Sequence, residues 1–426
     1  MLRRVWILGL LVVGGLAPCG CAREDSNRIV IRVANWDGAG DDDKFARLIQ
    51  DLNVEFEREN PGVEIRVENI PNEYVSKMIL SFIAKAEPDI MMLDLASAAV
   101  FVNNGVLTDL SPIIRKDSEF KLDDFFPNAL NAGRRGSSLY AIPKDFTPVV
   151  VYYNKRLFDS AGLPYPKPGW TYDDFLATAR KLTTKDRYGF AFSNWMGGWI
   201  TWLWNNGGDV LSPDGKRAEG YFDSPQNIEA VTFLRDLVKK YNVSPSLSAA
   251  ASMGVDPFAN GQAAMTVSGH WSMVGYANAP KDENGKPRIT WDDLGVVEMP
   301  HNTAQPQTVV YESGYAIGKN CKHKEMAWKY IKFMTGFHAQ SLYNSSGIAV
   351  DGRKDVAAER SKIPLEASFL PIIPAARPPW GSRVEGYEFV EHAGEAAMDS
   401  ILQNGTPVDE ALHRAAKQID FEFTKQ

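Results

Sequence analysis

The order of apolar patterns between residues 29 and 94 constrains the fold of this chain more than any other feature. Branched apolar residues alternate with polar ones at 29–34 and 63–67, and a short apolar run follows at 90–93, each typical of a β-strand. Apolar residues at helical spacing occupy the two stretches between them, 44–57 and 74–82. This alternation predicts parallel strands joined by crossover helices, so we expect an α/β fold.

Further along the chain the same kinds of signal predict more elements. Thr171, with Asp174 three residues later, has the spacing of a helix-capping box, and Ser224-Pro225 is typical of a helix start. Further elements are expected as strands at 149–153 and 263–267 and as helices at 324–335 and 408–423. Proline-rich stretches at 164–168, 300–306 and 371–379 are natural places for the chain to cross between two lobes.

Size and composition indicate a globular protein with more than one core. The chain has 426 residues, of which 44% are hydrophobic and 23% charged. A single hydrophobic core rarely serves so long a chain, so two domains are expected. The formal charge is −7, and without Arg3 and Arg4 it becomes −9, which argues against a partner that is nucleic acid.

The first twenty-one residues have the order of a secretory signal. Arg3 and Arg4 precede the apolar stretch 5–17, which is too short for a permanent membrane span. The region resembles a bacterial lipoprotein lipobox, in which Cys21, or alternatively Cys19, would be acylated. An ordinary cleaved signal with incidental cysteines is the alternative. Either interpretation places the mature protein outside the cytoplasm, lipid-anchored to the membrane if a cysteine is acylated.

Cys321 is the only cysteine beyond the signal, so the mature chain contains no pair for an intramolecular disulfide. It lies in a polar stretch that enters a predicted helix, and no neighbouring residue suggests a base that would activate it. We therefore expect a structural role for this thiol.

Candidate ligand contacts follow the predicted strands, because ligands of open α/β sheets sit beyond the carboxyl ends of the strands. Trp36 and Asp37 follow the first strand, and Asp94 follows the third. Indole can cover the C–H face of a sugar ring, and carboxylates accept hydrogen bonds from its hydroxyls. For Trp36 alone, packing in the protein is an equally good interpretation.

Three later segments add aromatic and acidic candidates. Asp145 precedes the apolar run at 149–153, although a turn aspartate is the alternative. Trp195 and Trp199 have helical spacing with Trp202, which predicts a buried helix face, whereas the intervening Gly197-Gly198 favours a loop that exposes the rings. Trp271 follows the strand expected at 263–267, beside His270, for which packing is the expected role.

Motifs of the common enzyme classes are missing from the sequence. There is no His-Glu-x-x-His pair, no phosphate-binding Gly-x-x-x-x-Gly-Lys-Ser/Thr loop and no Gly-x-Ser-x-Gly elbow. No metal, cofactor or catalytic residue is therefore expected. A pair of carboxylates such as Asp94 and Asp145 could in principle serve a glycoside hydrolase, which is the alternative function.

Several stretches, in the same order along the chain, resemble the family 1 extracellular solute-binding proteins of sugar ABC transporters. The matching stretches are Phe56–Val63, Glu87–Asp94, Leu139–Pro143, Tyr152–Phe158, Asp256–Met265 with Trp271, Ser313–Ile317 and His323–Trp328. Asp256–Met265 is the most specific of them. The resemblance runs from about Ile29 to beyond Asp351, whereas the last 60 residues are similar only in style.

The resemblance implies a two-lobed periplasmic-binding-protein-like fold of the class II type, with the ligand cleft between the lobes. Lobe 1 would comprise 28–145 and about 312–362, and lobe 2 about 146–311 and 363–426. The positions implied to line the cleft are Trp36, Asp37, Asp94, Asp145, Trp271 and Gly314, with a looser correspondence for Trp195, Trp199, Arg377 and Trp380.

The function that the resemblance implies is delivery of a bound carbohydrate to the permease subunits of an ABC transporter. Because the strand-end loops are acidic, a neutral mono- or oligosaccharide is expected rather than a sugar phosphate. We expect a monomer that closes around its ligand.

Overall fold

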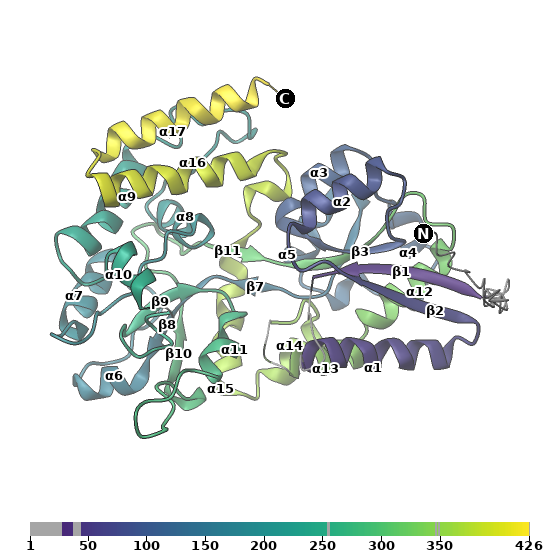
Figure 1. Cartoon of the computed structure of the whole chain (residues 1–426), viewed down its shortest axis with the longest axis horizontal. Coiled ribbons are helices and arrows are strands. Elements are labelled where there is room, and N and C mark those ends of the chain that lie inside the picture. The colour runs from purple at the N-terminus through teal and green to yellow at the C-terminus, as the bar shows by residue number, and fades with distance from the viewer. Residues whose placement is uncertain (1–27, 37–43, 254–255, 346, 348–349, 426) are drawn as a thin grey trace, which may run out of the picture.

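The computed structural model describes residues 28–36, 44–253, 256–345, 347 and 350–425. The signal segment 1–21, with Cys19 and Cys21, and the candidate Asp37 lie outside the described residues. Two α/β lobes lie side by side, with β7 (Thr147–Pro148) and β11 (Thr308–Tyr311) running between them (Figure 1).

The first lobe is built on a five-stranded sheet with the order β2-β1-β3-β12-β6. The two pairings of β1 are parallel, with Ile31 opposite Ile65 in β2 and Val33 opposite Ile90 in β3. The five strands are β1 (Ile29–Asn35), β2 (Val63–Asn69), β3 (Ile90–Asp94), β12 (Ser313–Ile317) and β6 (Ala141–Pro143). The parallel sheet expected from residues 29–94 is thereby confirmed, whereas β12 and β6 extend it through antiparallel pairs.

Helices cover this sheet and supply most of the first core. The longest is α1 (Lys44–Glu59), which ends where Gly62 takes a φ of 88° and turns the chain into β2. The other helices of this lobe are α2 (Tyr74–Ile83), α3 (Ala98–Asn103), α4 (Ser111–Ile114), α5 (Pro127–Ala132), α12 (Lys324–Met334) and α13 (Phe337–Ser345). The hairpin of β4 (Arg134–Arg135) and β5 (Ser138–Leu139) precedes β6. Cys321 is 8% exposed in this core, and burial raises its pKa to about 12, which fits a structural thiol.

The second lobe contains a three-stranded antiparallel sheet, β10-β8-β9, under a layer of helices. Its strands are β8 (Val150–Asn154), β9 (Met265–Ser268) and β10 (Leu294–Val297). Its helices are α6 (Lys155–Ser160), α7 (Tyr172–Leu182), α8 (Met196–Asn205), α9 (Pro225–Lys239), α10 (Leu247–Ser252), α11 (Ser272–Ala277), α16 (Tyr387–Asp399) and α17 (Val408–Phe423). Figure 1 shows α16 and α17 packed antiparallel along the outer side of this lobe.

A separate three-stranded sheet joins the lobes. Its central strand β11 pairs with β7 on one side and with β13 (Ala376–Arg377) on the other. The helices α14 (Lys354–Arg360) and α15 (Pro364–Ala367) lie between β12 and β13 in the chain. Of the three proline-rich stretches, 300–306 leads into β11 and 371–379 contains β13. The expectation for 164–168 was wrong, because that stretch joins α6 to α7, which pack in one core.

Among the described residues, no helix is both long enough and apolar enough to span a bilayer.

Candidate functional site

A cavity of about 290 Å³ opens where the two lobes face each other. The first lobe contributes Trp36 after β1 and Asp94 at the end of β3, and the second lobe contributes Trp195 and Trp271. The full lining is Trp36, Asp94, Asp145, Thr147, Trp195, Trp271, Tyr311, Glu312, Ser313 and Tyr343. Five predicted site residues, distant in sequence, therefore line one cavity.

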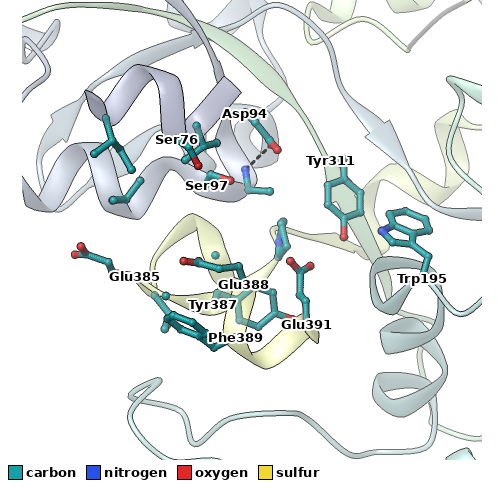
Figure 2. A pocket seen from close by; sticks show the side chains of 18 residues that line it. Ser76, Asp94, Ser97, Trp195, Tyr311, Glu385, Tyr387, Glu388, Phe389 and Glu391 are labelled. Carbon is teal, nitrogen blue, oxygen red and sulfur yellow. Dashed lines mark hydrogen bonds between the residues drawn. The ribbon is translucent and has the colours of Figure 1, made fainter. Parts of the chain in front are cut away.

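Two further cavities adjoin this one. The larger, about 600 Å³, shares Asp94, Trp195 and Tyr311 with it and extends between α2 and the segment 379–391 (Figure 2). The other, about 330 Å³, shares Trp36 and Asp94. We call the three together the cleft. Asp94 lines all of them, so it lies at the centre of the cleft.

Aromatic rings form the wall of the cleft on the side of the second lobe. The Trp195 ring meets the Trp271 ring edge to face, with centroids 5.7 Å apart, and lies 5.4 Å from the ring of Tyr311. Trp271 is 36% exposed, whereas most indoles of this chain are buried. On the opposite lobe, Trp36 packs edge to face on Tyr74 at 4.8 Å. Large apolar faces are thus available to a ligand from both lobes.

Asp145 ties the end of β6 to the start of β12. Its carboxylate accepts a hydrogen bond from the Ser313 backbone N at 2.7 Å and a second from the Ser313 hydroxyl. Lys144 Nζ lies 3.8 Å from Asp145 Oδ2, and it donates to the hydroxyl of Tyr343 at 2.6 Å. The Asp145 carboxylate therefore has a structural role at the cavity wall, whether or not it also contacts ligand.

Three carboxyl groups of the cleft, those of Asp94, Glu312 and Glu391, have raised pKa values. Burial, with a smaller contribution from Asp145, raises the pKa of Asp94 to about 6, although a hydrogen bond from the Ala96 backbone N opposes the shift. Burial and the neighbouring carboxylates Asp94, Glu395 and Glu388 raise the pKa of Glu391 to about 8. Glu312 is raised well above its usual range, mainly by burial. Asp94 and Glu391 therefore stay partly protonated near neutral pH.

The glycines Gly197 and Gly198 lie in the first turn of α8, so the expectation of a ring-exposing loop was wrong. A Cβ on Gly197 would lie 2.1 Å from the Tyr311 hydroxyl and 2.4 Å from the Trp195 ring. The residue type is thus required by the close approach of two cleft side chains and not by a break in the helix. Trp195 immediately precedes α8 and reaches the cleft, whereas Trp199, Trp202 and Trp204 are buried.

Four other predicted residues do not line any of the three cavities. Trp199 is 2% exposed, and its indole N–H donates to Asn194 Oδ1 at 3.2 Å. Trp380, 3% exposed, donates to Asp209 at 2.8 Å, and Arg377 pairs with the same carboxylate at 2.7 Å. Gly314 lies within β12, where a Cβ would lie 2.8 Å from the carbonyl O of Ile142. Each of these residues has a packing or pairing role in the protein itself.

Several residues that line the cleft were not predicted from the sequence. Tyr311 is the last residue of β11, and Glu312 lies between β11 and β12, directly before the matching stretch that begins at Ser313. The strand-end rule could therefore have found both. Glu388 and Glu391 lie on α16, and Tyr343 lies on α13, where no local pattern indicates a cleft. His270, as expected, is buried, and it is hydrogen-bonded to Glu366 at 2.7 Å. Within the described part of the chain, no group of His, Cys, Asp and Glu is arranged to hold a metal ion.

Comparison with known proteins decides the family. The sequence model described as "bacterial extracellular solute-binding protein" matches residues 38–340, which is more than half of the chain. The chain belongs to this family. The Brucella abortus protein BAB2_0491 is named as a binding protein. It is 25% identical to this chain over 443 aligned residues, and the alignment covers 99% of each protein. The mannitol-binding protein of Pseudomonas aeruginosa is 25% identical over 144 residues, 33% of this chain and 32% of that protein.

Solved structures show the same fold for this solute-binding protein. The ABC substrate-binding protein Lmo0181 from Listeria monocytogenes, in complex with cycloalternan, has a TM-score of 0.80 at 24% identity, covering 93% of this chain and 99% of that one. The maltose-bound MalE3 of T. maritima has a TM-score of 0.76 at 23% identity, covering 92% and 100%. The two-lobed binding-protein fold expected from the sequence is therefore confirmed.

Proposed function

We propose that this solute-binding protein is the carbohydrate receptor of an ABC importer. The observation that carries the proposal is the cleft itself, in which Trp36, Trp195 and Trp271 approach Asp94 from two lobes. Indole faces and carboxylate acceptors are the two surfaces that a sugar ring needs. Several similar structures were solved with such ligands, including cycloalternan, tagatose and ribitol.

The charge of the cleft argues against phosphorylated ligands. The sn-glycerol-3-phosphate-binding protein UgpB of Brucella abortus is 23% identical over 45% of this chain. A phosphate group is normally met by arginine or lysine side chains, and in the described lining of the cleft the charged residues are carboxylates. A carbohydrate without an anionic group, such as the expected neutral mono- or oligosaccharide, fits this lining better.

The wider role follows from the family and the N-terminal sequence. We propose that the protein is a monomer anchored outside the cytoplasm by lipid on Cys21, or alternatively Cys19, and that permease subunits receive its ligand. Residues 28–145 with about 312–362 would form one moving lobe, and about 146–311 with 363–426 the other. The strands β7 and β11 lie at two of these crossings and support this division. We propose that Asp94 and Asp145 bind the ligand and do not hydrolyse it, so the ligand should be recovered unchanged.

A thermal-shift screen of the chain starting at Ala22 against mono- and oligosaccharides tests the proposal. One or a few related sugars should raise the melting temperature and be recovered intact. Trp271→Ala should weaken their binding at least tenfold, about 1.4 kcal/mol, because it removes an exposed ring from the cleft wall. Phe421→Ala, which removes an exposed ring from α17, is the control and should leave affinity unchanged. Hydrolysis of the sugar, or equal affinities in both variants, would contradict the proposal.

A further inference from the structure

The cleft has an excess of negative side chains. Seven carboxylates line its three cavities, and the described lining includes no Lys, Arg or His. These residues are Glu73, Asp94, Asp145, Glu312, Glu385, Glu388 and Glu391. Figure 2 shows Glu388 and Glu391 below Asp94, with Tyr311 and Trp195 to one side. A cleft lined by one sign of charge attracts ligands of the opposite sign.

The cations nearest to the cleft serve the protein's own structure. Lys144 is 1% exposed behind Asp145 and is bound to the Tyr343 hydroxyl. Arg377 pairs with Asp209 at 2.7 Å and lies over the ring of Trp204. Arg383 stacks on Trp380 at 3.9 Å. None of the three lines the cleft, so the charged side chains of its described lining are all carboxylates.

Glu312 is a buried carboxyl group of the cleft that has no hydrogen-bond partner among the described residues. It lines the central cavity and is only 3% exposed, and neither of its carboxylate oxygens has a hydrogen-bond partner among the described residues. An unpaired buried carboxyl group is costly, and proteins retain one mainly where it is needed. An ammonium group that reaches this buried carboxyl group on binding would supply the missing donors.

The aromatic wall favours the same ligand chemistry. Trp36, Trp195, Trp271, Tyr311 and Tyr343 surround the central cavity that Asp94 and Glu312 also line. The negative face of an aromatic ring attracts a desolvated cation, and rings combined with carboxylates are a common way to bind an amine. A wholly neutral sugar would use the rings but would bring no positive charge to the carboxyl groups.

We propose that the ligand of this cleft is a saccharide or polyol carrying a basic amino group, whose ammonium lies beside Asp94 and Glu312. The inference rests on the proposed carbohydrate function and narrows it, replacing the neutral sugar expected from sequence. Asp94 is the centre of the proposed contact because it lines every part of the cleft, and the carboxyl groups of Glu312 and Glu391 both interact electrostatically with it.

The pKa values provide a signature of charge neutralisation. Asp94 and Glu391, with pKa values raised to about 6 and about 8, retain part of their protons at pH 7. A bound ammonium favours the ionised carboxylates and lowers these pKa values, so binding at pH 7 should release protons. The neighbouring charges that raise these pKa values are those of Asp145, Glu388 and Glu395, and they become less repulsive in the complex.

The test uses matched sugars that differ only in the amine. Titration calorimetry at pH 7 compares glucose with glucosamine, galactose with galactosamine, and cellobiose with the fully deacetylated chitobiose. In at least one pair the amino sugar should bind at least tenfold more tightly than its neutral partner. Proton release should appear as a binding enthalpy that changes with the ionisation enthalpy of the buffer. Its affinity should also fall as salt is added.

Two variants and a control assign the effect to the cleft. Glu312→Gln and Glu391→Gln should each reduce the ratio of the amine's affinity to the neutral partner's affinity several-fold. Glu59→Gln, at the exposed end of α1, should change neither. Equal or tighter binding of the neutral sugar in every pair that binds would overturn the inference and leave the carbohydrate receptor intact. Failure of every sugar, charged or neutral, to bind would overturn both.

Discussion

At the scale of single residues, Gly197 decides how closely the cleft aromatics approach α8. A methyl group there would overlap the Tyr311 hydroxyl and the Trp195 ring, although alanine is the better helix former. Gly197→Ala should therefore displace both rings and weaken sugar binding at least tenfold. Gly275→Ala in α11 is the matched control, since its Cβ would meet nothing within 4 Å. The control should change stability by no more than about 1 kcal/mol, in the favourable direction. Calorimetric affinities and thermal unfolding of both variants test this, and unchanged binding in Gly197→Ala would contradict it.

Asp351 is a single residue that should make stability depend on pH. Burial raises its pKa to about 8, although a hydrogen bond from the Arg353 backbone N and the charge of Arg353 oppose the shift. The unfolded carboxyl titrates near its usual value of about 4, so the folded state binds more protons between these values. Its contribution to stability is complete below about pH 4 and is lost as the pH rises through 8.

Asp351→Asn should flatten this dependence, because the amide cannot ionise and can still accept from Arg353. The free energy of unfolding by urea, measured at pH 5.5 and pH 8.5, should fall less with pH in the variant than in the parent. Glu59→Gln serves as the control and should retain the parental slope. An identical slope in Asp351→Asn would show that other groups carry the effect.

At the scale of elements, local sequence signals define the helix ends. The capping box at the start of α7 is present as expected, with Thr171 Oγ1 accepting from the Asp174 N and the Asp174 carboxylate accepting from the Thr171 N. Thr171→Ala should lower the free energy of unfolding by about 1 kcal/mol, whereas Thr171→Ser keeps the hydroxyl and most of the stability. Urea unfolding of both variants measures the difference. Equal losses from the two substitutions would mean that the methyl group, and not the hydrogen bond, matters.

Helices and strands could be predicted where the spacing of apolar residues within the segment itself determines them. The five strands and helices expected between residues 29 and 94 match β1, α1, β2, α2 and β3 within two residues at each boundary. Apolar spacing was sufficient there because each element buries one face or both. The antiparallel addition of β12 next to β3 was beyond such reasoning, because its partner lies over 200 residues away.

At the scale of the whole molecule, a ligand held by both lobes should stabilise the chain and draw the lobes together. Hydrogen bonds from Asn103 and Asn104 to Glu385 already join the two sides at one edge, at 3.2 and 3.4 Å. A sugar at 100 times its dissociation constant should raise the free energy of unfolding by about 2.7 kcal/mol. The radius of gyration from small-angle X-ray scattering should decrease on ligand addition and remain unchanged with a non-binding sugar. Stabilisation without any decrease would indicate binding to a lobe arrangement that is already closed.

The secondary-structure elements, the α/β class and, through the order of the motifs, the family could all be predicted from the amino-acid sequence. It also identified Trp36, Asp94, Asp145, Trp195 and Trp271, because strand ends and segment boundaries are local properties. The burial of Trp199 and Trp380, and the approach of Glu312 and Glu391 to Asp94, depend on how the segments pack in three dimensions. The physical reason is that burial, cavity shape and the pKa of a carboxyl group depend on the residues that the fold brings close. Those neighbours come from segments hundreds of residues apart, and the local sequence pattern does not predict which of these segments will be in contact.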